Sequence, residues 1–351
     1  MQVGMDVRVL SVQRQWTGVA QYIAGLVRGY QHDASGIALT GFSMEAERSA
    51  RVGIPVTVIK ARAGIPWQSA LLPLQLSPRQ VSVFHGPAFS VPPLARVPRV
   101  VTVHDLAFVR MPETVNDDTV AYLRRVVAAS VRSAATVIVP SAEVRDDLLE
   151  WMPRLSAARV RTIPLGADRL PMPPPAPSPL AQPYLLHVGT MEPRKNLGLL
   201  LDGFRRLIEE TSLPHRLVLV GAAGWKNSDL AEKIGGLGDR VVLPGYVGDQ
   251  ELARYFVHAA LYVSVSRYEG FGLGTVEALR FGVPVLATPT GVMRELTGPG
   301  VTRLLAGTAD ELAALLHRQL AGGSGRATLA VPGWRETWRA HARLYREVAG
   351  S

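Results

Sequence analysis

The chain has 351 residues, 47% of them hydrophobic, no cysteine and a formal net charge of +9. This length exceeds what one hydrophobic core usually organises, so we expect two domains, and the lack of any charge-free apolar run of about twenty residues excludes a membrane-spanning helix. The absence of cysteine is typical of a reducing compartment, so we expect a cytoplasmic protein.

The predicted elements alternate between short strands and helices along the whole chain. The strands are runs of apolar, mostly β-branched residues, and the stretches between them are amphipathic, as at 118–134 and 197–210. Continuous apolar strands of this kind indicate parallel sheets covered on both faces. We therefore predict an α/β protein with two Rossmann-like, doubly wound domains facing each other across a cleft. Besides an N-terminal strand, the expected strands are 56–60, 81–84, 99–105 and 135–141, then 183–189, 216–221, 240–245, 260–266 and 283–288.

A proline-rich segment separates the two series of strands. Seven prolines lie within residues 170–183, "LPMPPPAPSPLAQP", a density that excludes a helix or a central strand. We expect this segment to be an extended linker. It would join an N-terminal domain, residues 1–169, to a C-terminal domain, residues 184–333.

The final segment, residues 334–351, is predicted to be an amphipathic helix. Apolar residues recur there at spacings of four, four and three, which places them on one stripe of a helix. The simplest role for such a stripe is packing against the rest of the protein. Its members are Trp334, Trp338, Ala342 and Tyr345.

A glycine cluster between two glutamates, "EGFGLGTVE", is the first candidate site. It follows the expected strand 260–266, with Glu269 before the glycines and Glu277 after them. Repeated glycine indicates that another group approaches the backbone closely. We expect a following helix, capped by Thr275, whose first amides bind an anion. Glu277 could accept hydrogen bonds from a vicinal diol such as a ribose, or it could merely favour the helix dipole.

A cationic pair follows the first strand after the linker, in "HVGTMEPRKN". Gly189 and Thr190 are expected to form a tight turn, and Arg194 and Lys195 stand together just before the helix expected at 197–210. Guanidinium grips phosphate oxygens with a fork and ammonium supplies a compact charge, so the pair suits a diphosphate. Only four lysines occur in the chain, which makes a chance pairing less plausible. The alternative is two solvated surface charges.

Two further candidates lie in the first half. His104 ends the strand in "VHDLAF" and could donate a hydrogen bond to a sugar hydroxyl or stabilise a leaving phosphate, unless it is a structural histidine. Gly18 in "WTGVAQY" opens a helix and offers backbone amides to a phosphate.

These segments, together with "VPSAEVRDDL" and "IPLGAD", resemble glycosyltransferase family 4, the retaining enzymes of the GT-B fold. Glu269 and Glu277 match the E-x7-E signature of that family, and the resemblance covers nearly the whole chain. "VHDLAF" followed by "RMPE" is most similar to the bacterial mannosyltransferase-like branch that builds surface polysaccharides. One departure is the stretch 297–312, which lacks the usual apolar, strand-like run.

The resemblance implies a role for each candidate residue. The cationic pair would grip the donor diphosphate, Glu277 would bind the nucleotide ribose, and Glu269 would bind hydroxyls of the donor sugar. It also implies that the first domain binds the acceptor and that the final helix packs back on it. The expected catalytic residues are His104, Arg194, Lys195 and Glu269. The expected donor-binding residues are Gly18, Gly189, Thr190, Phe271, Gly272, Leu273 and Glu277.

The function implied is retaining transfer of a hexosyl unit from a nucleotide-diphosphate sugar to a saccharide or lipid-linked acceptor. GDP-mannose is the favoured donor, ahead of UDP-glucose and dTDP-rhamnose. No D-x-D triplet occurs, so we expect neither a metal nor another cofactor. The alternatives are a sugar-nucleotide epimerase on a similar scaffold and a non-catalytic protein that binds nucleotide sugars or a membrane surface.

The charge distribution bears on other partners. Of 38 basic residues only four are lysines, so an arginine-biased composition explains much of the surplus. No basic run interleaves with aromatic residues, and nucleic acid is therefore not expected as a partner. The first half of the chain carries more of the positive surplus, which leaves open peripheral contact with an anionic membrane at the inner face of the cell.

Overall fold

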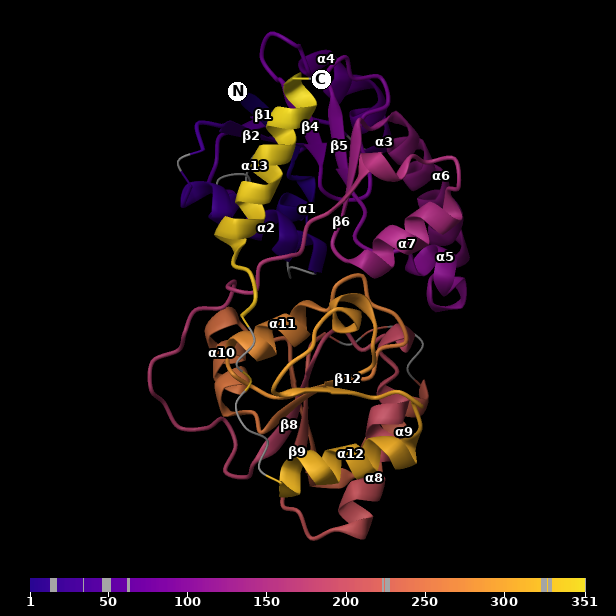
Figure 1. Cartoon of the computed structure of the whole chain (residues 1–351), viewed down its shortest axis with the longest axis vertical. Coiled ribbons are helices and arrows are strands. Elements are labelled where there is room, and N and C mark those ends of the chain that lie inside the picture. Colours follow the sequence, from indigo (N-terminus) through magenta and orange to yellow (C-terminus); the bar gives the residue numbers. More distant parts are fainter. Residues whose placement is uncertain are drawn as a thin grey trace. The chain divides into compact units, whose positions relative to one another are not determined.

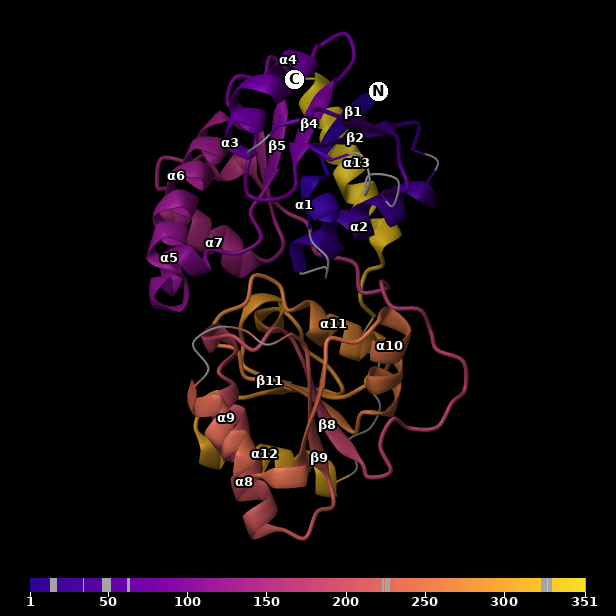
Figure 2. The same ribbon diagram turned by 180° about the vertical axis from the view of Figure 1, so that it is seen from behind.

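The computed structural model describes residues 1–12, 18–33, 35–45, 52–61, 64–222, 224, 228–322, 327 and 330–350. Their contacts divide the chain into two units, which are coloured along the sequence in Figures 1 and 2. Unit 1 combines Met1–Arg169 with Pro332–Ser351, and unit 2 is Leu170–Val331. Within the residues described, none of the helices has the length and apolar character of a membrane span.

Unit 1 is built on a parallel sheet whose described strands follow the order β3-β2-β1-β4-β5-β6-β7. Every neighbouring pair is parallel, and Val3 of β1, for example, pairs with Leu39 on one side and Val83 on the other. The order reverses direction between β1 and β4, so this is a doubly wound sheet. Its strands are β1 (Gln2–Asp6), β2 (Ala38–Ser43), β3 (Val56–Val58), β4 (Val83–Gly86), β5 (Arg99–Thr102), β6 (Thr136–Val139) and β7 (Val160–Thr162).

Helices cover both faces of this sheet because successive strand residues point to opposite sides. Val101 and Val137 pack against α6 and α7, whereas the next residue of β5, Thr102, hydrogen-bonds Tyr22 of α2 on the other face. The helices of unit 1 are α1 (Arg8–Val12), α2 (Gly18–Gln31), α3 (Gly64–Pro66), α4 (Leu72–Gln75), α5 (Ala107–Arg110), α6 (Asp117–Ser133), α7 (Ala142–Trp151) and α13 (Trp334–Gly350), with the turns η2 (Trp67–Leu71), η3 (Pro112–Thr114) and η4 (Ala157–Arg159).

The final helix, α13, runs alongside α2 (Figure 1). Two glycines of α2 make this approach possible: a methyl group on Gly25 would lie 2.3 Å from the Trp334 ring, and one on Gly29 would lie 2.2 Å from the Trp334 carbonyl oxygen. The predicted apolar stripe is confirmed, since Trp334, Trp338 and the two later members are all at most 1% exposed.

A buried hydrogen-bond network, called here the unit 1 network, joins α13 to the sheet. Its members are Tyr345, His85, Thr102, Tyr22, His341 and the carbonyl group of Thr337, linked in that order by five bonds of 2.7 to 2.9 Å. A carbonyl oxygen can only accept, so His341 Nδ1 carries a hydrogen and His341 Nε2 accepts from Tyr22. The same reasoning makes each member the donor to the next. Both histidines are neutral in this arrangement, and each uses both ring nitrogens.

Unit 2 contains a second parallel sheet, with the order β10-β9-β8-β11-β12-β13 among the described strands. Here the chain turns back between β8 and β11, which are hydrogen-bonded neighbours. The strands are β8 (Tyr184–Val188), β9 (Arg216–Val220), β10 (Val241–Gly245), β11 (Leu261–Ser264), β12 (Val285–Ala287) and β13 (Val301–Arg303). β13 lies in the stretch 297–312, where the sequence lacks an apolar, strand-like run. Three residues are too few to show a strand pattern in the sequence, and β13 is defined by its parallel pairing with β12.

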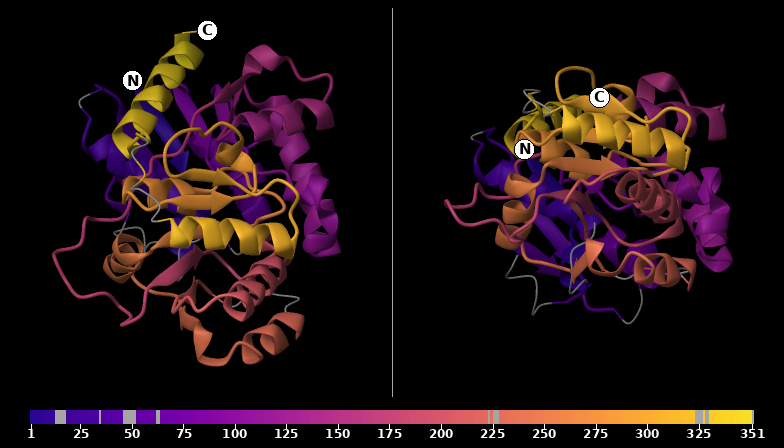
Figure 3. Two further views of the ribbon diagram at one scale, coloured as in Figure 1. Left: turned by 60° about the horizontal axis from the view of Figure 1, so that its bottom comes forward. Right: turned by 90° about the horizontal axis from the view of Figure 1, so that it is seen from below.

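Each face of this sheet has its own apolar core. Leu185 packs with α8 and α12, which lie beside each other (Figure 3), and its neighbour Leu186 packs with α10 and α11 on the other face. The helices of unit 2 are α8 (Leu197–Glu210), α9 (Ser228–Gly235), α10 (Asp249–His258), α11 (Leu273–Arg280) and α12 (Ala309–Ala321), with turns η5 (Pro193–Lys195), η6 (Gly238–Arg240) and η7 (Gly291–Arg294).

The proline-rich segment 170–183, expected to be a linker, belongs to unit 2 by its contacts. Leu170 is 1% exposed within the α10–α11 core. Prolines cannot donate backbone hydrogen bonds, but the carbonyl groups around them still accept. His258 and Arg254 of α10 donate to the carbonyl oxygens of Ala176 and Pro177 at 3.0 and 3.1 Å, so the segment is fastened along α10.

Candidate functional site

The candidate site of unit 2 lies where its sheet changes direction. The chain leaves β8 at Gly189 and leaves β11 at Val265, and these two strands are neighbours. In open α/β sheets, ligands bind beyond the carboxyl ends of the strands at such a switch point. The loop after β8 carries Arg194 and Lys195 in η5, and the loop after β11 carries Glu269.

Glu269 is the centre of the site. Lys195 Nζ donates to its Oε1 at 2.5 Å, Arg194 Nη1 to its Oε2 at 3.0 Å, and Ser266 Oγ to its Oε1 at 2.7 Å. Burial alone would raise the pKa of Glu269, but the charges of Lys195 and Arg194 prevail and hold this pKa well below its usual range. The carboxylate is therefore ionised, and both expected cations turn toward it.

The positive charges of this cluster are balanced within the protein. Arg194 also pairs with Glu192, with 2.5 Å between Nη2 and Oε1, and donates to the carbonyl oxygen of Tyr268 at 2.8 Å. Two cations thus face two carboxylates, and all four side chains are at most 17% exposed. An anion that enters therefore competes with these carboxylates for Arg194 and Lys195.

Two glycines of the cluster are required by the fold of unit 2 itself. Gly272 precedes α11 with a φ of 95°, a left-handed conformation that favours glycine. Gly274 lies against Tyr262, whose hydroxyl group would be 2.3 Å from an added Cβ atom. The expectation that the missing side chains serve a ligand is thus incomplete, because the packing of Tyr262 and the start of α11 already require two of the glycines.

The helix start also differs from expectation. Gly272, not Thr275, stands at the N-cap position, and α11 begins at Leu273. Thr275 lies within the first turn, where its buried side chain bonds the hydroxyl group of Tyr262. The amides of Leu273 and Gly274 have no acceptor inside the helix, since a helical amide bonds a carbonyl group earlier in the chain and the first such bond joins the amide of Thr275 to the carbonyl oxygen of Gly272 at 3.0 Å. The cap that precedes these amides is thus three residues earlier than the predicted cap at Thr275.

Glu277 is in the second half of α11 and is 2% exposed. Burial is the main cause that raises the pKa of Tyr262, and the charges of Glu269 and Glu277 raise this pKa further. Tyr262 thus lies close to both glutamates of the signature. Phe271 is buried as well, and its carbonyl oxygen accepts from the amide of Val292 at 2.8 Å.

The turn after β8 brings a further residue to the site. The amide of Gly189 donates to the carbonyl oxygen of Val220 at 2.9 Å, and Thr190 is half-buried. A Cβ atom on Gly189 would lie 3.4 Å from Lys195 Cε and 3.5 Å from Nε2 of His187. Gly189 therefore borders the side chains of both Lys195 and His187. His187 was not among the predicted site residues, although a histidine near the end of the strand that leads to the cationic pair was a usable signal.

His104 and Gly18 both lie in unit 1. His104 Nε2 donates to the carbonyl oxygen of Pro87 at 2.7 Å, and its ring packs between Tyr22 and Phe89. Burial lowers its pKa, so the neutral ring keeps Nδ1 as an acceptor. The hydrogen of His104 Nε2 thus goes to Pro87, and the role of His104 toward a sugar hydroxyl stays a prediction. Gly18 is the exposed first residue of α2, and no atom of the described residues lies within 4 Å of an added Cβ. Residues 13–17 of its loop lie outside the described residues.

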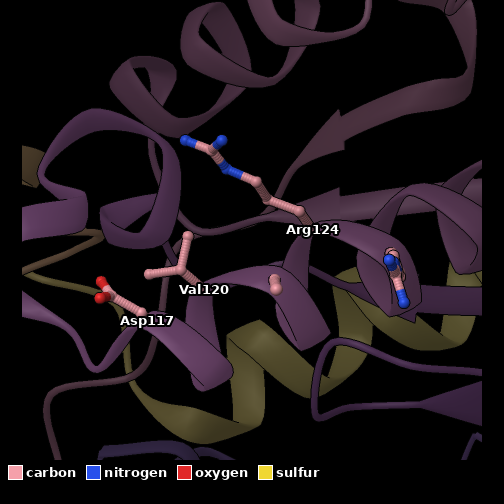
Figure 4. Close-up of a pocket in the computed structure, with 5 residues that line it drawn as sticks. Asp117, Val120 and Arg124 are labelled. Atoms are coloured by element: carbon pink, nitrogen blue, oxygen red, sulfur yellow. The ribbon is translucent and has the colours of Figure 1, made fainter.

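A separate hollow of about 380 Å³ lies on α6 of unit 1, lined by Asp117, Val120, Ala121, Arg124 and Arg125. Figure 4 shows Asp117, Val120 and Arg124 around it. It contains none of the expected site residues. Over the described ranges, no group of three or more histidine, aspartate or glutamate side chains is arranged to hold a metal ion.

Comparisons with known proteins address both halves of the chain. Residues 16–169 match the family model described as "Glycosyltransferase Family 4", and residues 182–321 match the model "Glycosyl transferases group 1". O-antigen chain mannosyltransferase B of Escherichia coli is 32% identical over 62% of this chain and 59% of its own length. Mannosylfructose-phosphate synthase of Agrobacterium fabrum is 31% identical over 36% of this chain and 30% of its own length. The chain thus spans less than two thirds of either relative.

Solved structures agree with the fold. The structure of Anabaena HepE in complex with UDP and glucose has a TM-score of 0.73 at 18% identity, over 99% of this chain and all of that one. Sucrose-phosphate synthase of Thermosynechococcus elongatus gives the same TM-score at 21% identity over the full length of both chains. With two parallel sheets of this order and a family model matched in each half, the chain belongs to glycosyltransferase family 4, has the GT-B fold and is similar to its bacterial mannosyltransferases.

Proposed function

We propose that the chain is a retaining hexosyltransferase that moves a hexosyl unit, with mannose favoured, from a nucleotide-diphosphate sugar to a hydroxyl group of a saccharide or lipid-linked acceptor. The observation that carries this proposal is the cluster of Glu269, Arg194 and Lys195 at the switch point beside the first amides of α11. The similarity to an Escherichia coli mannosyltransferase supports mannose, and HepE solved with UDP-glucose supports a nucleotide-sugar donor.

Donor binding exchanges partners within the cluster. The diphosphate oxygens replace Glu269 as acceptors for Arg194 and Lys195, and the released carboxylate accepts hydrogen bonds from hydroxyl groups of the donor sugar. The amides of Leu273 and Gly274 and the positive end of the α11 dipole add further stabilisation of the phosphate charge. Glu277 binds the ribose, and His104 of unit 1 accepts from a donor hydroxyl through Nδ1.

Charge stabilisation then lowers the barrier to transfer. The bond between the anomeric carbon and the diphosphate oxygen breaks as a bond to the acceptor oxygen forms on the same face, and the acceptor proton goes to the departing phosphate oxygen. Negative charge grows on the diphosphate in this step, so Arg194 and Lys195 bind the transition state more strongly than the ground state. Glu269 is occupied by sugar hydroxyls and is not a nucleophile, unlike the paired carboxylates of retaining glycosidases.

Ligand-dependent stability and sugar transfer together test this proposal. GDP, UDP and dTDP are compared by thermal shift, and we expect one to raise the melting temperature, because a ligand at about 100 times its Kd adds about 2.7 kcal/mol to the state it binds. The matching nucleotide sugar should then transfer its sugar to an acceptor, with equal rates with and without EDTA, since two side-chain cations and a helix end supply the charge.

Three outcomes contradict the proposal. Loss of transfer in EDTA excludes the metal-free mechanism. An epimerised donor that forms without any acceptor favours the epimerase, and nucleotide binding without transfer or hydrolysis favours the non-catalytic binding protein.

A further inference from the structure

The two ring nitrogens of His187, on β8, have different surroundings. This histidine is 2% exposed, and its Nδ1 is 2.9 Å from the carbonyl oxygen of Val263 on the neighbouring strand β11. That oxygen can only accept, so Nδ1 carries the hydrogen and Nε2 presents a lone pair. Among the described residues, no group hydrogen-bonds this buried Nε2.

An unpaired acceptor of this kind is costly. Leaving a buried polar atom without a hydrogen bond destabilises a protein by about 1–3 kcal/mol, and such an atom in a native structure calls for an explanation. Position supplies one: a Cβ atom on Gly189 would be 3.5 Å from His187 Nε2 and 3.8 Å from Lys195 Nζ. The lone pair and the ammonium group thus border the same small space over Gly189.

The ammonium group is the donor that chemistry selects. Phosphate oxygens carry no hydrogen at neutral pH and cannot pair with a lone pair, whereas ammonium has three N–H groups, one of which Glu269 takes. His187 also stays neutral, because burial and then the charge of Lys195 lower its pKa to about 4. A neutral imidazole has a useful property here: it orients an ammonium group without cancelling its charge, which a carboxylate does cancel.

We propose that His187 is a positioning residue for Lys195, whose ammonium group donates to His187 Nε2 when the donor diphosphate and sugar have displaced the ion pair with Glu269. This inference rests on the proposed function. In this structure Glu269 both holds and neutralises Lys195; in the donor complex His187 instead holds the ammonium group in position. The full charge of Lys195 then acts on the departing diphosphate from a fixed position.

Three substitutions separate the two nitrogens of the ring. His187→Gln keeps an acceptor near the position of Nε2 and loses the donor to Val263; His187→Asn keeps that donor and loses the acceptor; His187→Leu loses both at similar volume. We expect kcat to fall about tenfold in the Asn and Leu variants, with the donor KM changed less than about twofold, and to stay within about threefold in the Gln variant. Because Asn and Leu make the same prediction, the test survives if one of them does not fold.

The reverse order overturns the inference. If His187 only braces β8 against β11, then Asn is tolerated and Gln and Leu lose activity together. Equal activity in all three variants, or equal loss in all three, also overturns it, because neither pattern depends on the acceptor nitrogen.

A double-mutant cycle with Lys195 adds a readout that a structural role would not move. In a Lys195→Ala background, His187→Asn should cost no further activity, since its partner is gone, whereas additive losses contradict the pairing. The wild-type assay keeps the two proposals apart. A wild type that transfers no sugar refutes the proposed function, and an active wild type with tolerated Asn refutes only the role of His187.

Discussion

The unit 1 network and the unit 2 site use their buried histidines differently. In unit 1, His85 and His341 use both ring nitrogens in a network of neutral groups that returns to α13, where it began. In unit 2, His187 uses one nitrogen and leaves the other facing a lysine that is already held by Glu269. Both regions lie in the interior of an α/β unit, so burial alone does not distinguish them.

This difference distinguishes buried polar groups that stabilise the fold from buried polar groups that are arranged to bind a ligand. A buried polar network in which every hydrogen has a defined acceptor specifies one arrangement of its elements. A cluster of charges with a spare acceptor can exchange partners at little cost when an anion enters, and perturbed groups of this kind are concentrated at functional sites. Unit 1 network residues should therefore control stability, and the unit 2 cluster should control turnover.

The largest effect is expected from Lys195→Ala. Removing one preorganised donor to a developing negative charge costs about 10²–10³ in kcat, while the unfolding free energy should change little because Glu269 keeps Arg194 and Ser266 as partners. Steady-state transfer assays and urea unfolding measure the two effects. Lys233→Ala, which breaks a surface pair with Asp202, is the matched control. Unchanged kcat with weaker donor affinity would contradict a role in the departure of the diphosphate.

The second largest effect is expected from acid, which should reduce the folding stability that depends on the unit 1 network. Burial lowers the pKa of His341 to about 4 and that of His85 well below its ordinary value. Below about pH 6.5 the unfolded chain therefore binds protons that the folded chain does not, and stability is lost as the pH falls from about 6.5 toward 4, by up to about 1.4 kcal/mol per pH unit for each histidine.

Tryptophan fluorescence in urea reports this loss, because five of the six tryptophans belong to unit 1. His341→Asn should flatten the pH dependence by one proton. If the urea concentration at the midpoint of unfolding is the same at pH 7 and pH 5, the network does not keep its histidines neutral.

The smallest effect should come from Tyr345→Phe, which tests directly whether unit 1 tolerates a buried histidine nitrogen that has lost its partner. It would leave His85 Nδ1 buried and unpaired, the condition that His187 Nε2 already has in unit 2. We expect a loss of about 1–3 kcal/mol in unfolding free energy and unchanged kcat for the folded protein. Tyr122→Phe, at a tyrosine that is 46% exposed, is the control. No loss of stability would mean that unit 1 tolerates the unpaired nitrogen as well as unit 2 does.

Most of the fold could be predicted from the sequence, because buried parallel strands are apolar along their whole length. The strands that escaped prediction are β2, β7 and β13, which are polar, short or at a sheet edge. β2 also contains Gly41, whose added Cβ would be 2.9 Å from the side chain of Val7. Close packing of this kind depends on a partner distant in sequence and leaves no local pattern.

The sequence identified which residues form the site but not how their charges and hydrogen bonds are paired. The motif identified Glu269, Arg194 and Lys195, yet no spacing rule says that these charges neutralise one another without a ligand. The glycines were attributed to a ligand, although Tyr262 and the left-handed start of α11 require two of them. His187 was missed because its significance depends on which ring nitrogen faces Val263, a fact of orientation.

The return of α13 to unit 1 has a consequence for how the protein is made. A ribosome delivers all of unit 2 before it delivers Pro332 and the residues after it, and at 5–20 residues per second this interval lasts on the order of 10–30 seconds. During that time the glycine-lined surface of α2 is uncovered, and Tyr22 lacks the His341 acceptor that will later bury its hydroxyl group. The unit that is begun first is thus completed last, and nascent chains stalled near residue 331 should be the form that chaperones bind.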